Sequence, residues 1–365
     1  MVVVMLVFME VTVGGDGDRP LGNGDHSVLG VGKIDLSIFH ESGGWGYYLY
    51  FVQYNSFMAD KSEFDPQLII SHKFPELAYS YTERDAALYA LGVGVCGNDA
   101  LDDKELKYVY HPDGQQSIQV LPTFAALFSL GFTSHVGQLP GLQYDPRLLL
   151  HGQQYIEIYN SLPSNGCILN KASVAGLHDK GKAAVLEIEI ESYEKESGEV
   201  LCMNRVSLYL RGAGGFSGSS KPFSYAKYPA NEIPVYKIPE SQPFAVFEEC
   251  THPSQALLYR LSGDYNPLHS DPTIAEIAGF SRPILHGLCT LAIAVRAIIK
   301  CICRGKQSMI KSISGRFLLH VYPGESLITE MWLEGLSVLY QVKVKERNRA
   351  VLSGFVKLNC LSSSL

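Results

Sequence analysis

A helix-like segment followed by several strand-like runs occurs twice along the 365 residues of this chain. In the C-terminal half, the apolar stretch from Leu288 to Cys303 lacks proline and glycine and is long enough for several turns of buried helix. The runs after it alternate apolar and polar residues, as strands with one buried face do, at Ile313–Phe317, Ser326–Leu333, Val338–Lys345 and Val351–Leu358. Helix followed by antiparallel meander predicts α+β architecture.

The N-terminal half follows the same plan between residues 62 and 211. Near period-2 alternation predicts strands at Gln154–Tyr159, Ala183–Tyr193 and Leu201–Leu210. The Gly/Ser/Pro-rich segment from Gly212 to Pro222 predicts the start of a linker. We therefore expect two domains, 62–211 and 246–360, joined by a linker at 212–245 and followed by a tail at 361–365.

Composition and charge exclude several classes of function. A formal net charge of −7 gives no support for nucleic-acid binding. No apolar run approaches the roughly 20 residues that span a bilayer, so we expect no membrane insertion. Eight cysteines are scattered along the chain, which favours free thiols in a reducing compartment over a disulfide scaffold.

The N-terminal residues 1–57 carry no motif. The apolar run Met1–Met9 is short, has no basic flank and is followed by a glycine-rich stretch, so it does not resemble a signal peptide. We expect residues 1–57 to be a disordered tail or an extension of the gene model.

The segment Gly92–Gly97 satisfies the G-x-G-x-x-G pattern of dinucleotide-binding loops. That fingerprint should follow a buried strand and open a helix. Here it follows Thr82–Leu91, which begins like a capping box and predicts a helix. We therefore expect the glycines to end this helix instead of binding a nucleotide.

The densest group of reactive side chains lies between Tyr259 and Thr290. Asp264, Asn266 and His269 alternate with tyrosine, proline and leucine, so one stiff loop carries a carboxylate, an amide and an imidazole. These groups are suited to general acid–base catalysis.

Gly287 directly precedes the predicted apolar helix, at its N-terminal end. The first N–H groups of a helix have no partner within it, and the helix dipole favours negative charge at that end. Because glycine has no side chain to obstruct an approaching oxygen, the Gly287 N–H is a candidate oxyanion donor.

Each of these residues also has a structural interpretation. Asp264 could be a turn residue or an N-cap, and Asn266 followed by proline could initiate a turn. His269, Asp271 and His286 could ligate a metal, although their spacing matches no familiar zinc or di-iron signature and we expect no metal. His286 could simply tie down the loop before the helix.

The Tyr259–Thr290 stretch resembles the signature of the (R)-specific 2-enoyl-CoA hydratases, the MaoC-like hydratase 2 family, and the resemblance extends over about residues 62 to 365. It implies a double hotdog, in which two curved sheets each wrap a helix and join side by side. It also implies that Asp264 and His269 activate one water, that Asn266 orients it, and that the Gly287 amide binds the thioester oxygen. No cofactor is implied.

The resemblance further implies substrate contacts. Beside Asp264, His269 and Gly287, the matching positions for the CoA and acyl groups are His151, Gly152, Lys180 and Phe317. From the sequence alone, a loop Asp-Lys-Gly such as that at Lys180 is more often just a hairpin tip, and Phe317 is by default a core residue. Although Leu-Leu-His-Gly at 149–152 looks like Ile-Leu-His-Gly at 284–287, we expect the first to open a strand and the second a helix.

The function implied by the resemblance is reversible hydration of trans-2-enoyl-CoA to (R)-3-hydroxyacyl-CoA in fatty acid β-oxidation, especially of unsaturated fatty acids. The C-terminal Ser363-Ser364-Leu365 is a variant of the peroxisomal Ser-Lys-Leu address, so we expect a peroxisomal enzyme that binds the import receptor. A homodimer is the expected assembly. The alternatives are a hotdog acyl-CoA thioesterase and a non-catalytic acyl-CoA-binding protein.

Overall fold

The computed structural model describes residues 65–218, 221–228, 233–234 and 236–360. The expected N-terminal extension at 1–57 and the tail at 361–365 lie outside these residues. Within the described ranges, the strands form one antiparallel sheet of eleven. They are β1 (Leu77–Tyr81), β2 (Leu149–Ile158), β3 (Gly166–Asp179), β4 (Ala183–Glu194), β5 (Val200–Arg211), β6 (Ser224–Ala226), β7 (Ala245–Cys250), β8 (Ile310–Phe317), β9 (Ser326–Glu334), β10 (Ser337–Val344) and β11 (Arg349–Leu358).

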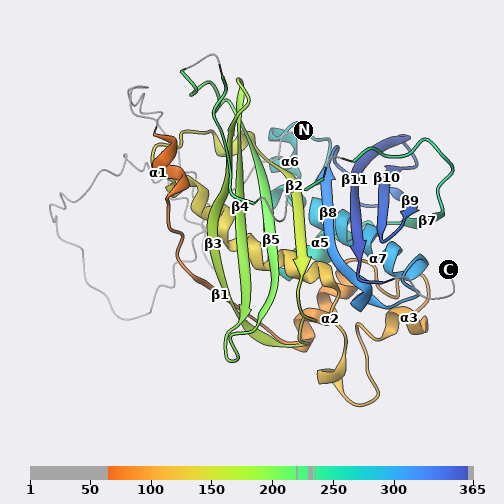
Figure 1. Ribbon diagram of the computed structural model, residues 1–365. Coiled ribbons are helices and arrows are strands. Elements are labelled where there is room, and N and C mark those ends of the chain that lie inside the picture. The colour runs from red at the N-terminus through yellow and green to blue at the C-terminus, as the bar shows by residue number, and fades with distance from the viewer. Residues whose placement is uncertain (1–64, 219–220, 229–232, 235, 361–365) are drawn as a thin grey trace, which may run out of the picture. The chain divides into compact units, whose positions relative to one another are not determined.

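Short helices and one long helix connect or cover these strands (Figure 1). The α-helices are α1 (Pro66–Ile70), α2 (Glu83–Gly92), α3 (Asp103–Leu106), α4 (Leu130–Thr133), α5 (Gln255–Tyr259), α6 (Pro272–Ile277) and α7 (Gly287–Cys301). The 3-10 turns are η2 (Gln115–Ser117), η3 (Pro122–Ser129), η4 (Ser134–Gln138), η5 (Pro146–Leu148), η6 (Arg260–Ser262), η7 (Pro267–His269) and η8 (Gln307–Met309). None of the helices in the described ranges is long and apolar enough to cross a bilayer.

The order of strands across the sheet shows that it is built from two halves. It runs β1-β3-β4-β5-β2-β8-β11-β10-β9-β7, with β6 paired to β3. Strands from the N-terminal half therefore occupy one side and strands from the C-terminal half the other. The halves meet where β2 pairs with β8, in a ladder that runs from Gln153 opposite Arg316 to Glu157 opposite Ser312.

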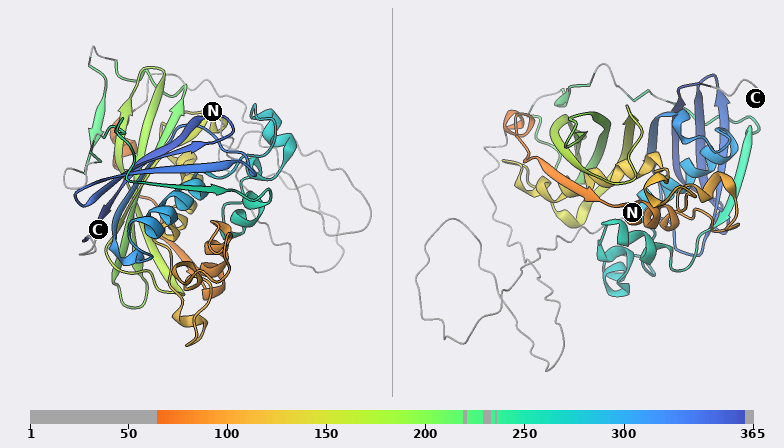
Figure 2. Two further views of the ribbon diagram at one scale, coloured as in Figure 1. Left: turned by 90° about the vertical axis from the view of Figure 1, so that its right-hand side faces the viewer. Right: turned by 90° about the horizontal axis from the view of Figure 1, so that it is seen from below.

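Each half-sheet curves around helical segments of its own half, as the view from below makes plain (Figure 2). In the C-terminal half this segment is α7, which is buried from Leu288 to Ile299. In the N-terminal half it is η3, whose eight residues are all buried, followed by α4 and η4. The α+β prediction is confirmed, and the helical element of the N-terminal half is a tighter, interrupted one.

The strand predictions are right in type and incomplete in number. All seven predicted runs form strands, and the apolar helix begins at Gly287, one residue before the predicted start. The sequence patterns did not predict β1, β3, β6 or β7. β3 is the longest strand, yet Gly166, Asn170 and Gly176 interrupt its apolar pattern. Sheet pairing with β1, β4 and β6 overrides these weak strand formers.

The glycines at 92–97 end a helix, as predicted. Thr82 and Asp85 form the capping box of α2. The helix stops at Gly92, and Gly94 follows with φ of +84°, a conformation that glycine adopts without steric cost. A Cβ at Gly94 would also lie 2.8 Å from the Glu249 carboxylate, which would have to move to admit a larger residue. The segment therefore ends a helix, and it lacks the strand–turn–helix context of a dinucleotide loop.

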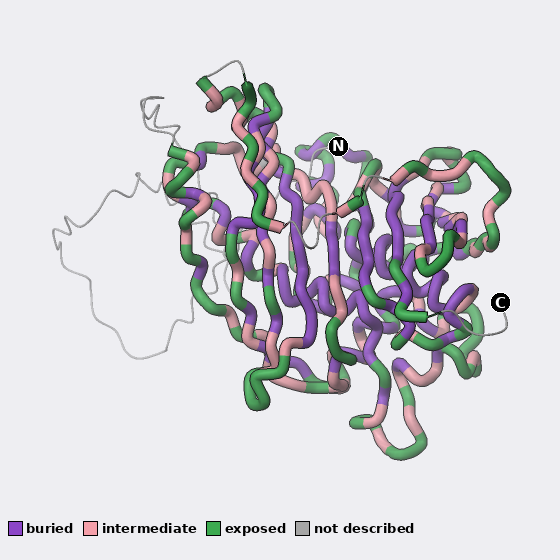
Figure 3. The backbone as a smooth tube through the Cα atoms, in the orientation of Figure 1, coloured by how far each residue is buried: buried purple, intermediate pink, exposed green. Residues whose placement is uncertain are grey.

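Three described residues between β6 and β7 lie on the face of the sheet that is turned away from α7. They are Ile233, Tyr236 and Ile238, and they pack on an apolar cluster of both halves, formed by Tyr155, Met203, Trp332, Leu339 and Phe355. Trp332 Nε1 donates a 2.8 Å hydrogen bond to the Ser241 carbonyl. Both faces of the strands near the junction are therefore covered, and the tube view shows these strands largely buried (Figure 3). All eight cysteines are free thiols, as predicted.

Candidate active site

The loop that carries Asp264 is shaped by local turn chemistry. Gly263 has φ of +115°, so the chain can leave η6 and turn sharply. The Asn266 N–H donates to Asp264 Oδ1 over 3.3 Å, and Asn266 Oδ1 accepts from the Leu268 N–H over 3.1 Å. Both side chains thus play the turn roles that were the structural alternative. Asn266 is the N-cap of η7, and Asp264 is not an N-cap.

His269 ends η7 and is buried, with 6% of its surface exposed. Its Nδ1–H donates to the Ile284 carbonyl over 2.8 Å, which leaves the lone pair on Nε2. Burial lowers the pKa of His269 below its ordinary value and Arg260 acts in the same direction, while Asp264 and the Ile284 hydrogen bond oppose the shift. The ring is therefore neutral near pH 7 and can accept a proton.

The ring of His286 lies against the ring of His269. It is the N-cap of α7, and its Nε2–H donates to the backbone carbonyl of Asp264 over 3.2 Å. Its ring stacks on that of His269, with 3.7 Å between centroids and 28° between planes. Burial, together with the neighbouring His269, lowers the pKa of His286 far below its ordinary value. The structural role that was the alternative for His286 is therefore a hydrogen bond that links the start of α7 to the Asp264 loop.

Asp264, His269 and His286 come close enough to raise the metal alternative again. One ligand atom from each lies within 4.8 Å of the others. However, imidazole lone pairs lie in the ring plane, and stacked rings direct them side by side instead of toward one point. The predicted partner Asp271 is used elsewhere, since its carboxylate caps α6 through the Thr273 and Ile274 N–H groups. The arrangement favours proton transfer over metal ligation.

Gly287, Phe317 and His151 form a continuous wall next to this cluster. A Cβ at Gly287 would lie 3.1 Å from two carbons of the Phe317 ring, so the ring covers the start of α7 closely. Phe317 ends β8, and its ring meets that of His151 on β2 edge to face at 5.0 Å. Burial lowers the pKa of His151 to about 4. Residues from both sides of the junction thus converge on the first turn of α7.

The other two predicted contacts belong to the N-terminal half. Gly152 lies at a bulge, where the pairing of β2 with β5 shifts register between His151 and Gln153. Lys180 is exposed and opens the hairpin between β3 and β4. Because Ala184 and Leu149 both pair with Leu210, this hairpin is at the same end of the sheet as His151. Lys180 therefore lies at a hairpin tip, as the structural alternative predicted.

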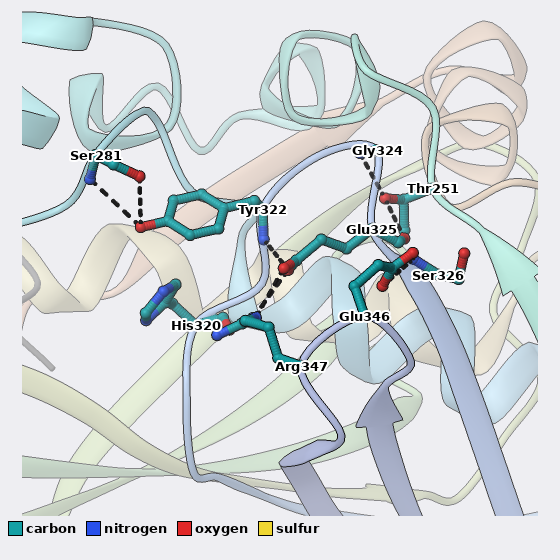
Figure 4. Close-up of polar contacts among 9 residues, drawn as sticks. All are labelled: Thr251, Ser281, His320, Tyr322, Gly324, Glu325, Ser326, Glu346 and Arg347. Carbon is teal, nitrogen blue, oxygen red and sulfur yellow. Dashed lines mark hydrogen bonds and ion pairs between the residues drawn. The ribbon is translucent and has the colours of Figure 1, made fainter.

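The loop after Phe317 is braced by polar contacts (Figure 4). Glu325 accepts the Tyr322 N–H at 2.7 Å and forms an ion pair with Arg347. The Tyr322 hydroxyl lies 3.1 Å from the Ser281 hydroxyl. The same loop accepts the Leu285 N–H at the Val321 carbonyl, over 2.7 Å. These bonds fix the chain just before His286 and Gly287.

Two neighbours of the site were not predicted. The Tyr259 ring packs on His286 at 4.8 Å, and Tyr259 is fully buried. The Arg260 guanidinium lowers the pKa of both histidines and lies 5.1 Å from the Tyr265 ring. Both residues immediately precede the loop in sequence, and a cation beside an acid–base motif is the signal that could have singled out Arg260.

Comparison with known proteins shows the family to which the chain belongs. Residues 79–212 match the family model of the MFE-2 hydratase 2 N-terminal domain, and residues 234–354 match the MaoC-like domain. The chain is 65% identical to the peroxisomal enoyl-CoA hydratase 2 of Arabidopsis thaliana, over 83% of this chain and 98% of that one. It is 39% identical to the probable enoyl-CoA hydratase 2 of Dictyostelium discoideum, over 80% and 96%.

Solved structures show the same architecture. The MaoC-like dehydratase of Phytophthora capsici superimposes with a TM-score of 0.69 at 32% identity, over 82% of this chain and all of that one. A Mycobacterium tuberculosis protein described as having a double hotdog fold gives a TM-score of 0.50 at 13% identity, over 79% of this chain and 96% of that one, and so shares the fold alone. The fold and site thus define a MaoC-like double hotdog protein, which confirms the predicted fold. Within that class, the chain belongs to the enoyl-CoA hydratase 2 family.

Proposed function

We propose that the protein catalyses the reversible hydration of trans-2-enoyl-CoA to (R)-3-hydroxyacyl-CoA in peroxisomal β-oxidation, especially of unsaturated fatty acids. The observation that carries this function is the meeting of Asp264, neutral His269 and the start of α7 beside Phe317 and His151. The peroxisomal location follows from the relatives, which include the Arabidopsis enzyme and the mouse peroxisomal multifunctional enzyme type 2.

Asp264 and His269 are the proposed catalytic pair. The pair removes a proton from one water, and the hydroxide of that water adds to Cβ of the enoyl thioester. The pair then returns a proton to Cα, so the reaction consumes no net proton. The Nε2 lone pair of neutral His269 can accept a proton, and the Asp264 carboxylate is close enough to share the same water. General acid–base assistance of this kind typically contributes roughly 10²–10⁴ in rate. Asn266 is the residue proposed to orient the water.

The Gly287 N–H is the proposed donor to the thioester oxygen. Negative charge passes through that oxygen when Cβ is attacked, and one preorganised donor in a dry site contributes roughly 3–4 kcal/mol. Gly287 is the first residue of α7, so its N–H belongs to the turn whose donors have no partner within the helix. The dipole of this fifteen-residue helix favours the developing charge.

The remaining contacts extend the site toward CoA. Phe317 lies against Gly287 at the start of α7, and its ring meets that of His151. These two residues and Gly152, the neighbour of His151, are the proposed wall for the thioester and acyl groups. Lys180, on the hairpin at the same end of the sheet, is the proposed contact for the CoA phosphates. A lysine can serve such a group as an exposed point charge.

An assay separates hydration from the two alternatives. The purified protein is incubated with trans-2-decenoyl-CoA while the enoyl-thioester absorbance and free thiol are followed together. Hydration lowers the absorbance without releasing thiol, a thioesterase releases thiol, and a binding protein does neither. Adding an S-specific 3-hydroxyacyl-CoA dehydrogenase and NAD should yield no NADH, because the expected product has the R configuration. Strong NADH formation would contradict the proposal.

The import signal, the assembly state and the domain boundaries remain predictions. Ser363-Ser364-Leu365 lies outside the described residues and is the proposed ligand of the peroxisomal import receptor. Deleting these three residues should turn a punctate fluorescent fusion diffuse while hydratase kinetics stay unchanged; continued entry into peroxisomes would remove the tail from the proposal. Sedimentation of the purified protein tests the homodimer. Limited proteolysis tests the division into 62–211, 212–245 and 246–360.

A further inference from the structure

Asp179 is a buried carboxylate at the end of β3, with 4% of its surface exposed. Four hydrogen bonds converge on it. Oδ1 accepts the N–H groups of Gly181 at 2.8 Å and Gly215 at 2.9 Å. Oδ2 accepts the N–H of Ser217 at 2.8 Å and its hydroxyl at 2.6 Å. A charged group that is buried and fully bonded holds the chain segments around it in one arrangement.

The bonds to Asp179 join two separate segments of the chain. Gly181 belongs to the hairpin between β3 and β4, whereas Gly215 and Ser217 belong to the glycine-rich segment that follows β5. Gly214 packs between them so closely that a Cβ there would lie 2.4 Å from the Ala183 carbonyl oxygen. Burial alone would raise the pKa of Asp179, but the four hydrogen bonds outweigh it and lower the pKa to about 2. The carboxylate is therefore charged near neutral pH.

The hairpin held in this way carries two exposed lysines, Lys180 and Lys182, on either side of Gly181. Gly181 has φ of +75°, and Lys180 N–H donates to the Ala183 carbonyl over 2.8 Å, so the turn is tight. Through the pairings of β3, β4, β5 and β2, the hairpin lies roughly 15–20 Å from His151, from the strand spacing and the rise per residue. That span suits the phosphopantetheine arm that separates a thioester from the phosphates of CoA.

We propose that Asp179 is a positioning residue for CoA recognition, which fixes the 180–182 hairpin on the glycine-rich segment so that Lys180 faces the CoA phosphates. The inference rests on the proposed function, because it takes Lys180 as a phosphate contact. Asp179 itself does not touch the substrate. Its action is indirect, since a flexible hairpin would lose conformational entropy on binding and a fixed one does not.

The test compares two thioesters that differ in the phosphates. Asp179→Asn removes the charge and keeps the side-chain shape. It should raise KM for trans-2-decenoyl-CoA about tenfold, equivalent to 1.4 kcal/mol, and leave kcat within about twofold. With trans-2-decenoyl-pantetheine, which lacks the nucleotide and its phosphates, both constants should stay at the wild-type values. Ser217→Ala, which removes one of the four bonds, is the milder second variant and should change KM for the CoA substrate in the same direction.

Introducing Asp179→Asn into the Lys180→Ala variant distinguishes an effect on the position of Lys180 from a general loss of structure. If Asp179 acts through Lys180, adding Asp179→Asn to Lys180→Ala should raise KM for the CoA substrate less than about twofold further. Equal losses with both thioesters, or the full tenfold effect in the Lys180→Ala background, would overturn the proposal. Calorimetric binding of saturated decanoyl-CoA gives the same comparison without turnover. A wild-type protein that binds this ligand but hydrates neither thioester would contradict the proposed function and leave the role of Asp179 to be decided by the binding data.

Discussion

The imidazole rings of His269 and His286 lie face to face, with 3.7 Å between their centroids. Two charged rings could not remain at this distance in a buried site, and burial lowers the pKa of both. His286 uses its one N–H to hold the carbonyl of Asp264, so the same ring touches both members of the proposed catalytic pair. His286 thereby links the backbone of Asp264 to the ring of His269.

This arrangement makes a prediction for His286. His286→Phe keeps an aromatic ring against His269 but leaves the Asp264 carbonyl without its donor, so kcat should fall about tenfold. His286→Gln can still donate a hydrogen bond and should retain more activity than the phenylalanine variant. Steady-state kinetics with trans-2-decenoyl-CoA provide the measurement. Wild-type turnover in His286→Phe would show that the tie to Asp264 is dispensable.

The catalytic pair should behave as a unit. Asp264→Asn and His269→Gln are each expected to lower kcat by roughly 10²–10⁴, because both side chains act on one water. The double variant should lose much less than the product of the two single effects. Circular dichroism and thermal melting check that folding survives. Near wild-type turnover in either single variant would exclude that residue from the pair.

Gly287 is expected to tolerate no side chain. In Gly287→Ala the new methyl group would lie 3.1 Å from the Phe317 ring, so the ring must move and kcat/KM should fall by roughly 10–100-fold. Gly218→Ala is a matched control, since no atom of the described residues lies within 4 Å of its added Cβ, and it should leave activity unchanged.

The double variant Gly287→Ala/Phe317→Leu tests the cause of this loss. A smaller side chain at 317 gives the methyl group room, so part of the lost kcat/KM should return. If Phe317→Leu instead lowers activity equally in both backgrounds, the contact between the two residues does not explain the effect.

His151 should make stability depend on pH. Its pKa is about 4 in the folded protein and about 6.5 in an unfolded chain, so the unfolded state binds the proton first as pH falls. Its contribution to stability is therefore present above about pH 6.5 and is lost between pH 6.5 and 4, by roughly 1.4 kcal/mol per pH unit. Urea unfolding of wild type and His151→Gln between pH 7 and 4.5 measures this. Parallel pH profiles would show that His151 is not buried as a neutral ring.

The local chemistry of the site could be read from the sequence because its parts are close together along the chain. Asp264, Asn266 and His269 lie within six residues, and turn preferences alone shape their loop. The helix at Gly287 follows from an apolar run without glycine or proline. What spacing could not give is the stacking of His286 on His269, because that contact depends on how the helix packs against the loop.

Partners from distant segments explain most of what was missed. Arg296 interrupts the apolar run of α7 and is buried, because Glu105 and Glu249 form ion pairs with it from α3 and β7. β7 has only six residues, and its Val246 is exposed, so its own pattern gives a weak strand signal. Pairing with β9 holds it in the sheet. The role of Asp179 likewise appears only when the hairpin and the glycine-rich segment are brought together.

β2 pairs with β8 within one polypeptide. Because the two halves have separate sequences in one chain, they need not be symmetric. In two identical subunits every change would appear on both sides of such a junction. Here one half contains a long helix and the proposed acid–base loop, whereas the other has an irregular turn in the corresponding place and carries the proposed substrate contacts His151 and Lys180. A ligand titration should accordingly saturate at one acyl-CoA per chain, with one half committed to the reaction and the other free to adapt to the shape of the substrate.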